Sequence, residues 1–283
     1  MCLISVDEVA RRLHDPDIRL ADVRWFLVRP GGGRSDYLAG HIPGAVFVDV
    51  DADLATAPGP GRHPLPEPAD VARRLGELGF GSEHLVVAYD DGGGLSAARL
   101  WWMLDVLGHR RVVVLDGGIA AWTAAGLPLE AGERRAPAAT LALRDRWERT
   151  IDRETLRSRL GTVVLLDARA PERYRGEIEP VDPVAGHIPT AVSLDAPGSL
   201  RPDGRLLPAA ELAARYASVG AGGGPGRPET VVYCGSGVNS CHHALAMRVA
   251  GLPDPTIYSG SYSDWTRAGL PVAVGPDPGE RPG

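Results

Sequence analysis

Short apolar runs alternate along the chain with longer segments in which apolar residues recur every three or four positions. The runs at 162–166 and 230–233 are apolar or β-branched and lack polar alternation, which is typical of strands buried on both faces. Helical periodicity marks four segments, three of them followed directly by a glycine: 69–78, 97–107, 209–218 and 240–250. This alternation predicts the α/β class, with parallel sheets covered by helices on both faces.

The pattern occurs twice. His-Ile-Pro at 41–43 returns at 187–189, and an Asp-x-Arg motif at 22–24 returns at 167–169. Two further matches keep the same order, with offsets that drift only from 146 to 143 positions. A period this long is that of a whole domain rather than of a solenoid unit. Two copies of one domain joined by a linker are therefore predicted: 1–129, 130–149 and 150–283.

A glycine-containing loop in the second copy has the features of a reactive site. The apolar run ends at Tyr233, Cys234-Gly235-Ser236-Gly237 follows, and a helix begins near Asn239. Ligands of open parallel sheets bind beyond the carboxyl ends of the strands, where Cys234 is expected. The glycines allow successive backbone N–H groups to converge, and the helix adds its positive end, so a thiolate would be stabilised. The alternative is a buried cysteine that serves as a small hydrophobic residue, which explains the apolar run but not the loop.

The other cysteines and the paired histidines do not indicate a site. Cys241 shares a helical stripe with Leu245 and Val249, so we expect it to be structural. His242 and His243 are adjacent and point in different directions, which disfavours a shared metal ion. No metal or organic cofactor is therefore expected.

The composition and net charge limit the classes of partner that the chain is expected to bind. With 44% apolar and 23% charged residues, a net charge of −6 and a pI near 5.8, the chain is not suited to a nucleic acid or an anionic membrane as its main partner. No stretch approaches the ~20 apolar residues that cross a bilayer, and the N-terminus lacks the pattern of a signal peptide. Three cysteines do not make a disulfide framework, and we expect a cytoplasmic location.

Over about residues 3–274 these motifs resemble the two-domain rhodanese and mercaptopyruvate sulfurtransferase family. The resemblance implies two rhodanese-like domains, with the catalytic cysteine, here Cys234, only in the second. Asp90 stands at the equivalent position of the first domain, which would be supportive. The loop Cys-Gly-Ser-Gly-Val-Asn is similar to the Cys-Gly-Ser-Gly-Val-Thr of the mercaptopyruvate branch, from which it departs at Asn239, and differs from the basic Cys-Arg-Lys-Gly-Val-Thr of the thiosulfate branch.

The resemblance also implies roles for individual residues. Ser236 and His41 would handle protons, Arg175 would hold the anionic donor, and four residues of the loop would cradle the transferred sulfur: Gly235, Gly237, Val238 and Asn239. Two alternatives stay open, because His187 occupies the same repeat position as His41, and Arg175 could belong to a surface ion pair. A second donor-binding arginine is missing from 179–184, which weakens the mercaptopyruvate assignment.

The predicted function is sulfur transfer through a persulfide on Cys234, from a small anionic donor (3-mercaptopyruvate or thiosulfate) to cyanide, a thiol or reduced thioredoxin. A Cys-dependent phosphatase is disfavoured, because Ser240 stands where that class requires an arginine six residues after the cysteine. A binding module without catalysis fits the first domain, but it leaves the nucleophile loop of the second unexplained.

Overall fold

The computed structural model describes residues 2–224 and 226–282. The chain divides into two compact units, and neither is a single continuous stretch of sequence. The first contains the residues up to Thr56, then Leu65–Glu148 and Leu200–Leu206. The second contains Arg149–Ser199, the residues from Leu207 onward, and Ala57–Pro64, a segment from the N-terminal half of the sequence. The units thus differ in outline from the uninterrupted domains 1–129 and 150–283 expected from the repeat.

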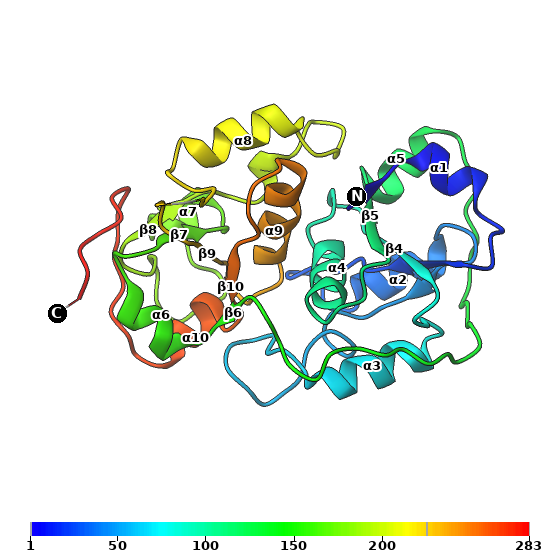
Figure 1. Cartoon of the computed structure of the whole chain (residues 1–283), viewed down its shortest axis with the longest axis horizontal. Coiled ribbons are helices and arrows are strands. Elements are labelled where there is room, and N and C mark those ends of the chain that lie inside the picture. The colour runs from blue at the N-terminus through cyan, green and yellow to red at the C-terminus, as the bar shows by residue number, and fades with distance from the viewer. Residues whose placement is uncertain (1, 225, 283) are drawn as a thin grey trace. The chain divides into compact units, whose positions relative to one another are not determined.

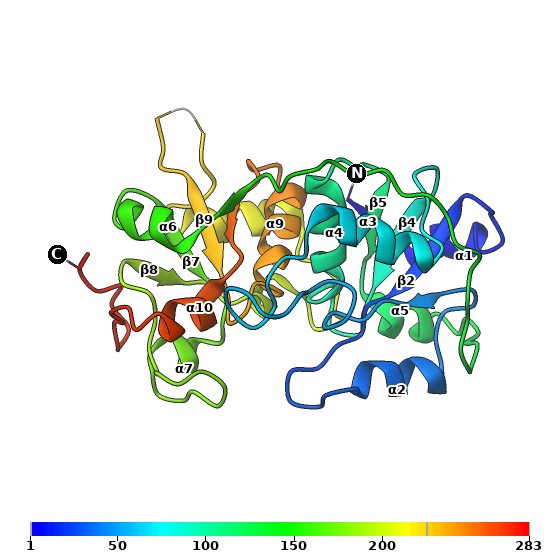
Figure 2. The same ribbon diagram turned by 90° about the horizontal axis from the view of Figure 1, so that it is seen from below.

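The first unit is a parallel sheet with helices on both faces (Figures 1 and 2). Figure 2 shows α3 and α4 on one face and α2 and α5 on the other. Its elements, in chain order, are β1 (Leu3–Ile4), α1 (Val6–Arg11), β2 (Ile18–Asp22), α2 (Gly32–Ala39), β3 (Val46–Phe47), α3 (Pro68–Glu77), β4 (Leu85–Tyr89), α4 (Ala97–Val106), β5 (Val112–Leu115) and α5 (Gly118–Ala124).

The second unit repeats this plan. Its elements are β6 (Thr150–Ile151), α6 (Arg153–Arg159), β7 (Val164–Asp167), α7 (Pro171–Tyr174), β8 (Ala191–Ser193), the 3₁₀ helix η1 (Pro197–Ser199), α8 (Ala209–Ala217), β9 (Thr230–Tyr233), α9 (Ser240–Val249), β10 (Thr256–Tyr258) and α10 (Ser261–Arg267). Apolar residues of β7 and β9 pack with Leu156 of α6 and Trp265 of α10 in one buried core.

The two sheets have the same strand order. In the described part of the chain it is β1-β5-β4-β2-β3 in the first unit and β6-β10-β9-β7-β8 in the second, with every pair of neighbours parallel. The register places Asp22 beside Tyr89 and Asp167 beside Tyr233. Each Asp-x-Arg motif therefore lies next to the end of β4 or β9, the strand that precedes the loop containing Asp90 or Cys234. The predicted fold class, two parallel α/β domains, is confirmed.

The segment expected to be a linker packs onto the first unit. The Ala139 amide donates to the Gly76 carbonyl (2.9 Å), the Arg144 amide donates to the Leu107 carbonyl (2.8 Å), and Leu141 is buried. Trp147 stacks on Trp102 with ring centroids 5.9 Å apart. Apolar side chains therefore hold this stretch in place, although it has no counterpart in the repeat.

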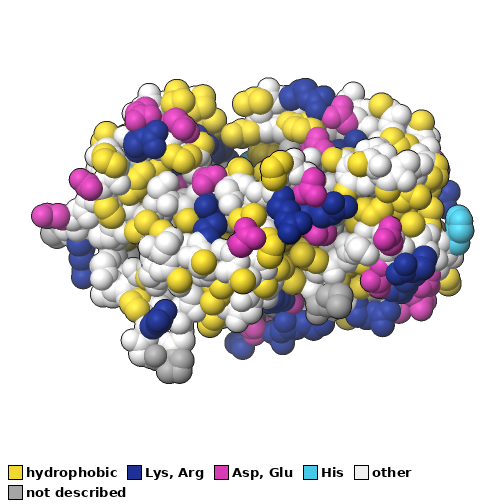
Figure 3. All heavy atoms as spheres, turned by 90° about the horizontal axis from the view of Figure 1, so that it is seen from above, with side chains coloured by type: hydrophobic (Ala, Val, Ile, Leu, Met, Phe, Trp, Pro, Cys, Tyr) yellow, Lys and Arg dark blue, Asp and Glu magenta, His cyan; other side chains and the backbone are white. Residues whose placement is uncertain are grey.

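The surface carries charges of both signs. Figure 3 shows Arg side chains next to Asp or Glu side chains over the face that it displays. No helix among the residues that the structure describes is long and apolar enough to span a bilayer.

Candidate active site

Cys234 lies where β9 ends, and it is almost completely buried, with 4% of its surface exposed. The Gly237 amide donates to its Sγ at 3.1 Å, and the hydroxyls of Ser240 and Ser261 lie 3.8 and 4.0 Å from the same sulfur. The loop thus places a backbone N–H and two hydroxyls around one sulfur atom.

The start of α10 fixes the shape of this loop. The Tyr262 amide donates to the Cys234 carbonyl, and the Ser263 amide donates to the Gly235 carbonyl, both at 3.0 Å. Gly237 has a φ of +87°, and a Cβ at this residue would lie 2.4 Å from the Ser259 carbonyl oxygen. Only glycine fits there, because the backbone is left-handed and the neighbouring chain is too close.

Two guanidinium groups approach the loop at Gly235. A Cβ placed on Gly235 would lie 2.7 Å from Nη2 of Arg62 and 3.6 Å from Nη1 of Arg173. Arg62 belongs to the segment Ala57–Pro64 of the second unit, and Arg173 belongs to α7. Neither residue was expected at the site from the sequence. The local sign for Arg173 was its position two residues before Arg175, the C-cap of α7.

Acidic side chains hold these arginines in position. Asp182 pairs with Arg62 Nη1 and lies 3.1 Å from Arg173 Nη2, while Glu179 lies 2.6 Å from the latter. Both carboxylates are nearly fully buried, and burial raises the pKa of Asp182 while Arg62 opposes that rise. The segment in which a second arginine was sought, 179–184, thus carries acids that bind arginines from elsewhere.

Arg175 lies in a different environment. Its Nε and Nη2 donate to Glu177 at 2.7 and 2.9 Å, and about a third of its side chain is exposed. Its guanidinium is therefore engaged in a surface ion pair, which was the alternative left open for it.

The structure places His41 in the first unit, in the same local environment that His187 has in the second. His41 Nδ1 lies 2.9 Å from the Tyr37 carbonyl and its ring stacks on Tyr37, whereas His187 Nδ1 lies 2.8 Å from the Tyr174 carbonyl and stacks on Tyr174. The contacts of Nε2 differ: this atom lies 3.9 Å from the Glu130 carboxylate in His41 and 3.1 Å from the Asp277 carbonyl in His187. The shared contacts support a structural role in both units.

The remaining predicted residues belong to the loop. Ser236 and Val238 are buried, and Asn239 is the N-cap residue of α9. Cys241 Sγ lies 3.4 Å from the carbonyl of Gly237 in the loop that precedes α9. His243 is buried, and its Nδ1 lies 2.8 Å from the Tyr216 hydroxyl.

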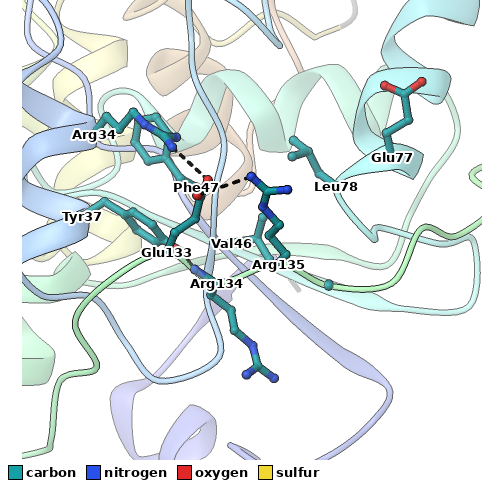
Figure 4. Close-up of a pocket in the computed structure, with 10 residues that line it drawn as sticks. Arg34, Tyr37, Val46, Phe47, Glu77, Leu78, Glu133, Arg134 and Arg135 are labelled. Carbon is teal, nitrogen blue, oxygen red and sulfur yellow. Dashed lines mark hydrogen bonds and ion pairs between the residues drawn. The ribbon is translucent and has the colours of Figure 1, made fainter.

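A pocket of about 310 Å³ in the first unit has a different character (Figure 4). Glu133 at its edge pairs with Arg34 at 2.9 Å and with Arg135 at 3.5 Å, and Tyr37 and Phe47 line it. Arg34 and Arg135 are paired with Glu133, and none of the lining residues belongs to the cysteine loop.

Two parallel α/β domains, the second with a thiol held in a glycine loop, define the class of protein. The rhodanese-like domain family matches residues 5–125 and again 152–268. A probable 3-mercaptopyruvate sulfurtransferase of Pseudomonas aeruginosa is 45% identical over 282 residues, covering 96% of this chain and 98% of that protein. A putative thiosulfate sulfurtransferase, SseB, of Mycobacterium tuberculosis is 39% identical over 270 residues, covering 93% of each.

The structural comparison agrees. The crystal structure of SseA from Escherichia coli, a 3-mercaptopyruvate sulfurtransferase, matches with a TM-score of 0.78 and 32% identity, covering 92% of this chain and 98% of that one. The chain belongs to the rhodanese-like family, and it is a sulfurtransferase.

Proposed function

We propose that Cys234 is the sulfur-carrying nucleophile of this enzyme. The observation that carries the proposal is the contact between the Gly237 amide and Cys234 Sγ, 3.1 Å long, at the carboxyl end of β9. The Gly237 amide and the N-terminus of α9 both direct positive partial charge at the sulfur, which attacks the donor in its thiolate form.

The reaction has two steps. The Cys234 thiolate attacks the outer sulfur of an anionic donor, the bond between that sulfur and the rest of the donor breaks, and a Cys234 persulfide remains. From thiosulfate the leaving group is sulfite. From 3-mercaptopyruvate it is the pyruvate enolate, which takes up a proton. An acceptor (cyanide, a thiol or reduced thioredoxin) then attacks the outer sulfur of the persulfide and regenerates the thiolate.

For the donor we propose 3-mercaptopyruvate in preference to thiosulfate. The loop of six residues from Cys234 to Asn239 contains no cation, which disfavours a dianion at the sulfur itself. The Ser236 hydroxyl can relay the proton that the enolate requires, a need that thiosulfate does not share. The names of the relatives include both donors, so they do not decide between the two.

For the carboxylate or sulfonate of the donor we propose Arg173 as the binding residue. Its Nη1 lies beside Gly235, whereas Arg175 is occupied by Glu177. A planar guanidinium can offer two parallel N–H groups to either anion.

Intact mass measurement after incubation with a donor tests the nucleophile. We expect the wild type and Cys241→Ser to gain the mass of one sulfur atom, and Cys234→Ser to gain none and to lose sulfur transfer. A sulfur retained on Cys234→Ser but absent from Cys241→Ser would contradict the assignment. For the wild type, a tenfold higher kcat/KM with thiosulfate than with 3-mercaptopyruvate would overturn the choice of donor. The assignment of sulfur transfer would be unaffected.

A further inference from the structure

The segment Ala57–Pro64 is firmly attached to the second unit, although it comes from the N-terminal half of the sequence. The Arg62 amide donates to Ser263 Oγ at 3.0 Å, and Arg267 Nη1 donates to the Gly61 carbonyl at 2.8 Å. A Cβ on Gly61, whose φ is +80°, would lie 2.4 Å from the Gly260 carbonyl oxygen. These contacts involve α10 and the residue before it, and α10 also shapes the cysteine loop.

The guanidinium of Arg62 is only partly used by the protein. Nη1 pairs with Asp182, but among residues 2–224 and 226–282 neither Nη2 nor the buried Nε has a hydrogen-bond partner. Nη2 is the atom that lies 2.7 Å from the Cβ position of Gly235. A buried donor without a partner, such as Nε, is rare in folded proteins, and Nη2 of the same guanidinium is available to a ligand at the loop.

Arg173 presents a second donor at the same place. Its Nε and Nη2 are taken up by Glu179 and Asp182, whereas Nη1, 3.6 Å from the Gly235 Cβ position, has no partner within the described residues. Asp182 touches both arginines and thereby fixes the spacing of their remaining N–H groups. Two guanidinium groups therefore direct unused donors toward one residue of the cysteine loop.

We propose that Arg62 is a second donor-binding residue, which acts with Arg173 on the anionic end of the sulfur donor and takes the place of the arginine missing from 179–184. The inference rests on the proposed function of the Cys234 loop. The ligand is an oxyanion, either the carboxylate of a mercapto acid or the sulfonate end of thiosulfate, since both accept two N–H bonds from a guanidinium. Asp182 is a positioning residue, because it pairs with both arginines.

Two-substrate steady-state kinetics of Arg62→Ala and Arg62→Lys test this role with each donor in turn. A charge-assisted contact corresponds to about 10–150-fold in affinity, so Arg62→Ala should raise the KM for the donor by that factor. The KM for the acceptor should not change, because the acceptor reacts after the donor remnant has left. Arg62→Lys should recover part of the loss, because it keeps the charge but not the planar fork. Arg157→Ala, an exposed arginine of α6, is the matched control and should behave as the wild type.

Comparing the KM values for the two donors shows which anionic group Arg62 binds, the carboxylate or the sulfonate. A parallel rise in KM for both donors identifies a general oxyanion contact, and a rise for one alone identifies Arg62 as the residue that selects that donor. Guanidinium added to Arg62→Ala should restore activity, which a loss of folding would not allow.

If the wild type accumulates the persulfide but Arg62→Ala has an unchanged KM for both donors, the inference is overturned. A wild type without persulfide would instead show that the proposed function has failed. Persulfide formation by Arg62→Ala at saturating donor is the check that its cysteine loop is intact.

Discussion

The loop after β4 and the loop after β9 have the same place in the fold but hold different side chains at their centres. In the first unit the Asp90 carboxylate occupies the centre of the loop, where it accepts the amides of Gly92, Gly94, Ser96 and Ala97 and the Ser96 hydroxyl at 2.7–3.0 Å. In the second unit Cys234 Sγ accepts the Gly237 amide at 3.1 Å. The strand–loop–helix turn therefore directs backbone N–H groups at one side chain in both units, at the Asp90 carboxylate in one and at Sγ of Cys234, the proposed nucleophile, in the other.

Contacts that both units share are better explained by architecture than by catalysis. Arg24 pairs with Asp22 at 2.6 Å and donates to the Gly40 carbonyl, and Arg169 does the same with Asp167 and Gly186 at 2.7 and 2.6 Å. These pairs hold the Asp-x-Arg motif beside the next loop in either unit. The contacts of Arg62 and Arg173 with the cysteine loop belong to the second unit alone, and these are the residues to test for function.

The largest effect is expected from Asp90→Asn, which removes the fixed anion of the first unit. One carboxylate oxygen becomes an NH₂ group that faces backbone N–H donors, so this unit should lose about 1.5–3 kcal/mol of stability. Denaturant unfolding measures the loss, with the exposed neighbour Asp91→Asn as control. Sulfur transfer at 25 °C should stay within about threefold of wild type. A fall of more than tenfold in the folded variant would mean that the first loop takes part in the reaction.

Acid should destabilise the second unit through His243, at the position that corresponds to Arg99 of the first unit. Burial lowers the pKa of His243 to about 3, from 6.5. The unfolded imidazole gains its proton as the pH falls below about 6.5, and the folded one does not. The contribution of His243 to the free energy of unfolding is therefore fully present above that pH. Stability should then decrease by about 1.4 kcal/mol by pH 5.5 and continue to decrease toward pH 3.

Urea unfolding of the wild type and of His243→Gln at pH 7.5 and 5.5 measures this dependence. The glutamine keeps an acceptor for the Tyr216 hydroxyl but does not titrate, so its stability should vary less with pH. An equal loss of stability in the two proteins would assign the acid sensitivity to other groups.

The fold and the position of Cys234 after a buried strand could be predicted because their signals are local. Buried strands, glycine-terminated helices and the repeated motifs all lie within short stretches, and Cys234 follows directly from the strand Thr230–Tyr233. The segment 130–149 was expected to be a linker because it has no repeat partner. Its apolar Leu141 and Trp147 were the available sign that it packs on the first unit.

The two arginines that we propose as donor-binding residues could not be predicted in the same way. Arg62 lies 172 positions before Cys234 in a loop rich in glycine and proline, and no local pattern connects the two residues. Arg173 and Arg175 are two residues apart, and the choice between them depends on the end of the four-residue helix α7. Arg173 lies within that helix and approaches the loop, whereas Arg175 is its C-cap and turns to Glu177. Side-chain direction at a helix end is a tertiary property, which periodicity does not contain.

The smallest effect is expected from the paired substitutions His41→Asn and His187→Asn. Each histidine bonds a tyrosine carbonyl through Nδ1 and stacks on that tyrosine, so each change should lower the stability of its own unit by about 0.5–1.5 kcal/mol. Because the two environments match, kcat with 3-mercaptopyruvate should stay within about threefold of wild type in both variants. The pH profile of kcat provides a readout that stability does not affect. A tenfold fall in kcat and an altered pH profile in His41→Asn, with His187→Asn unaffected, would instead make His41 a proton carrier. The difference between the two units would then extend beyond the cysteine loop.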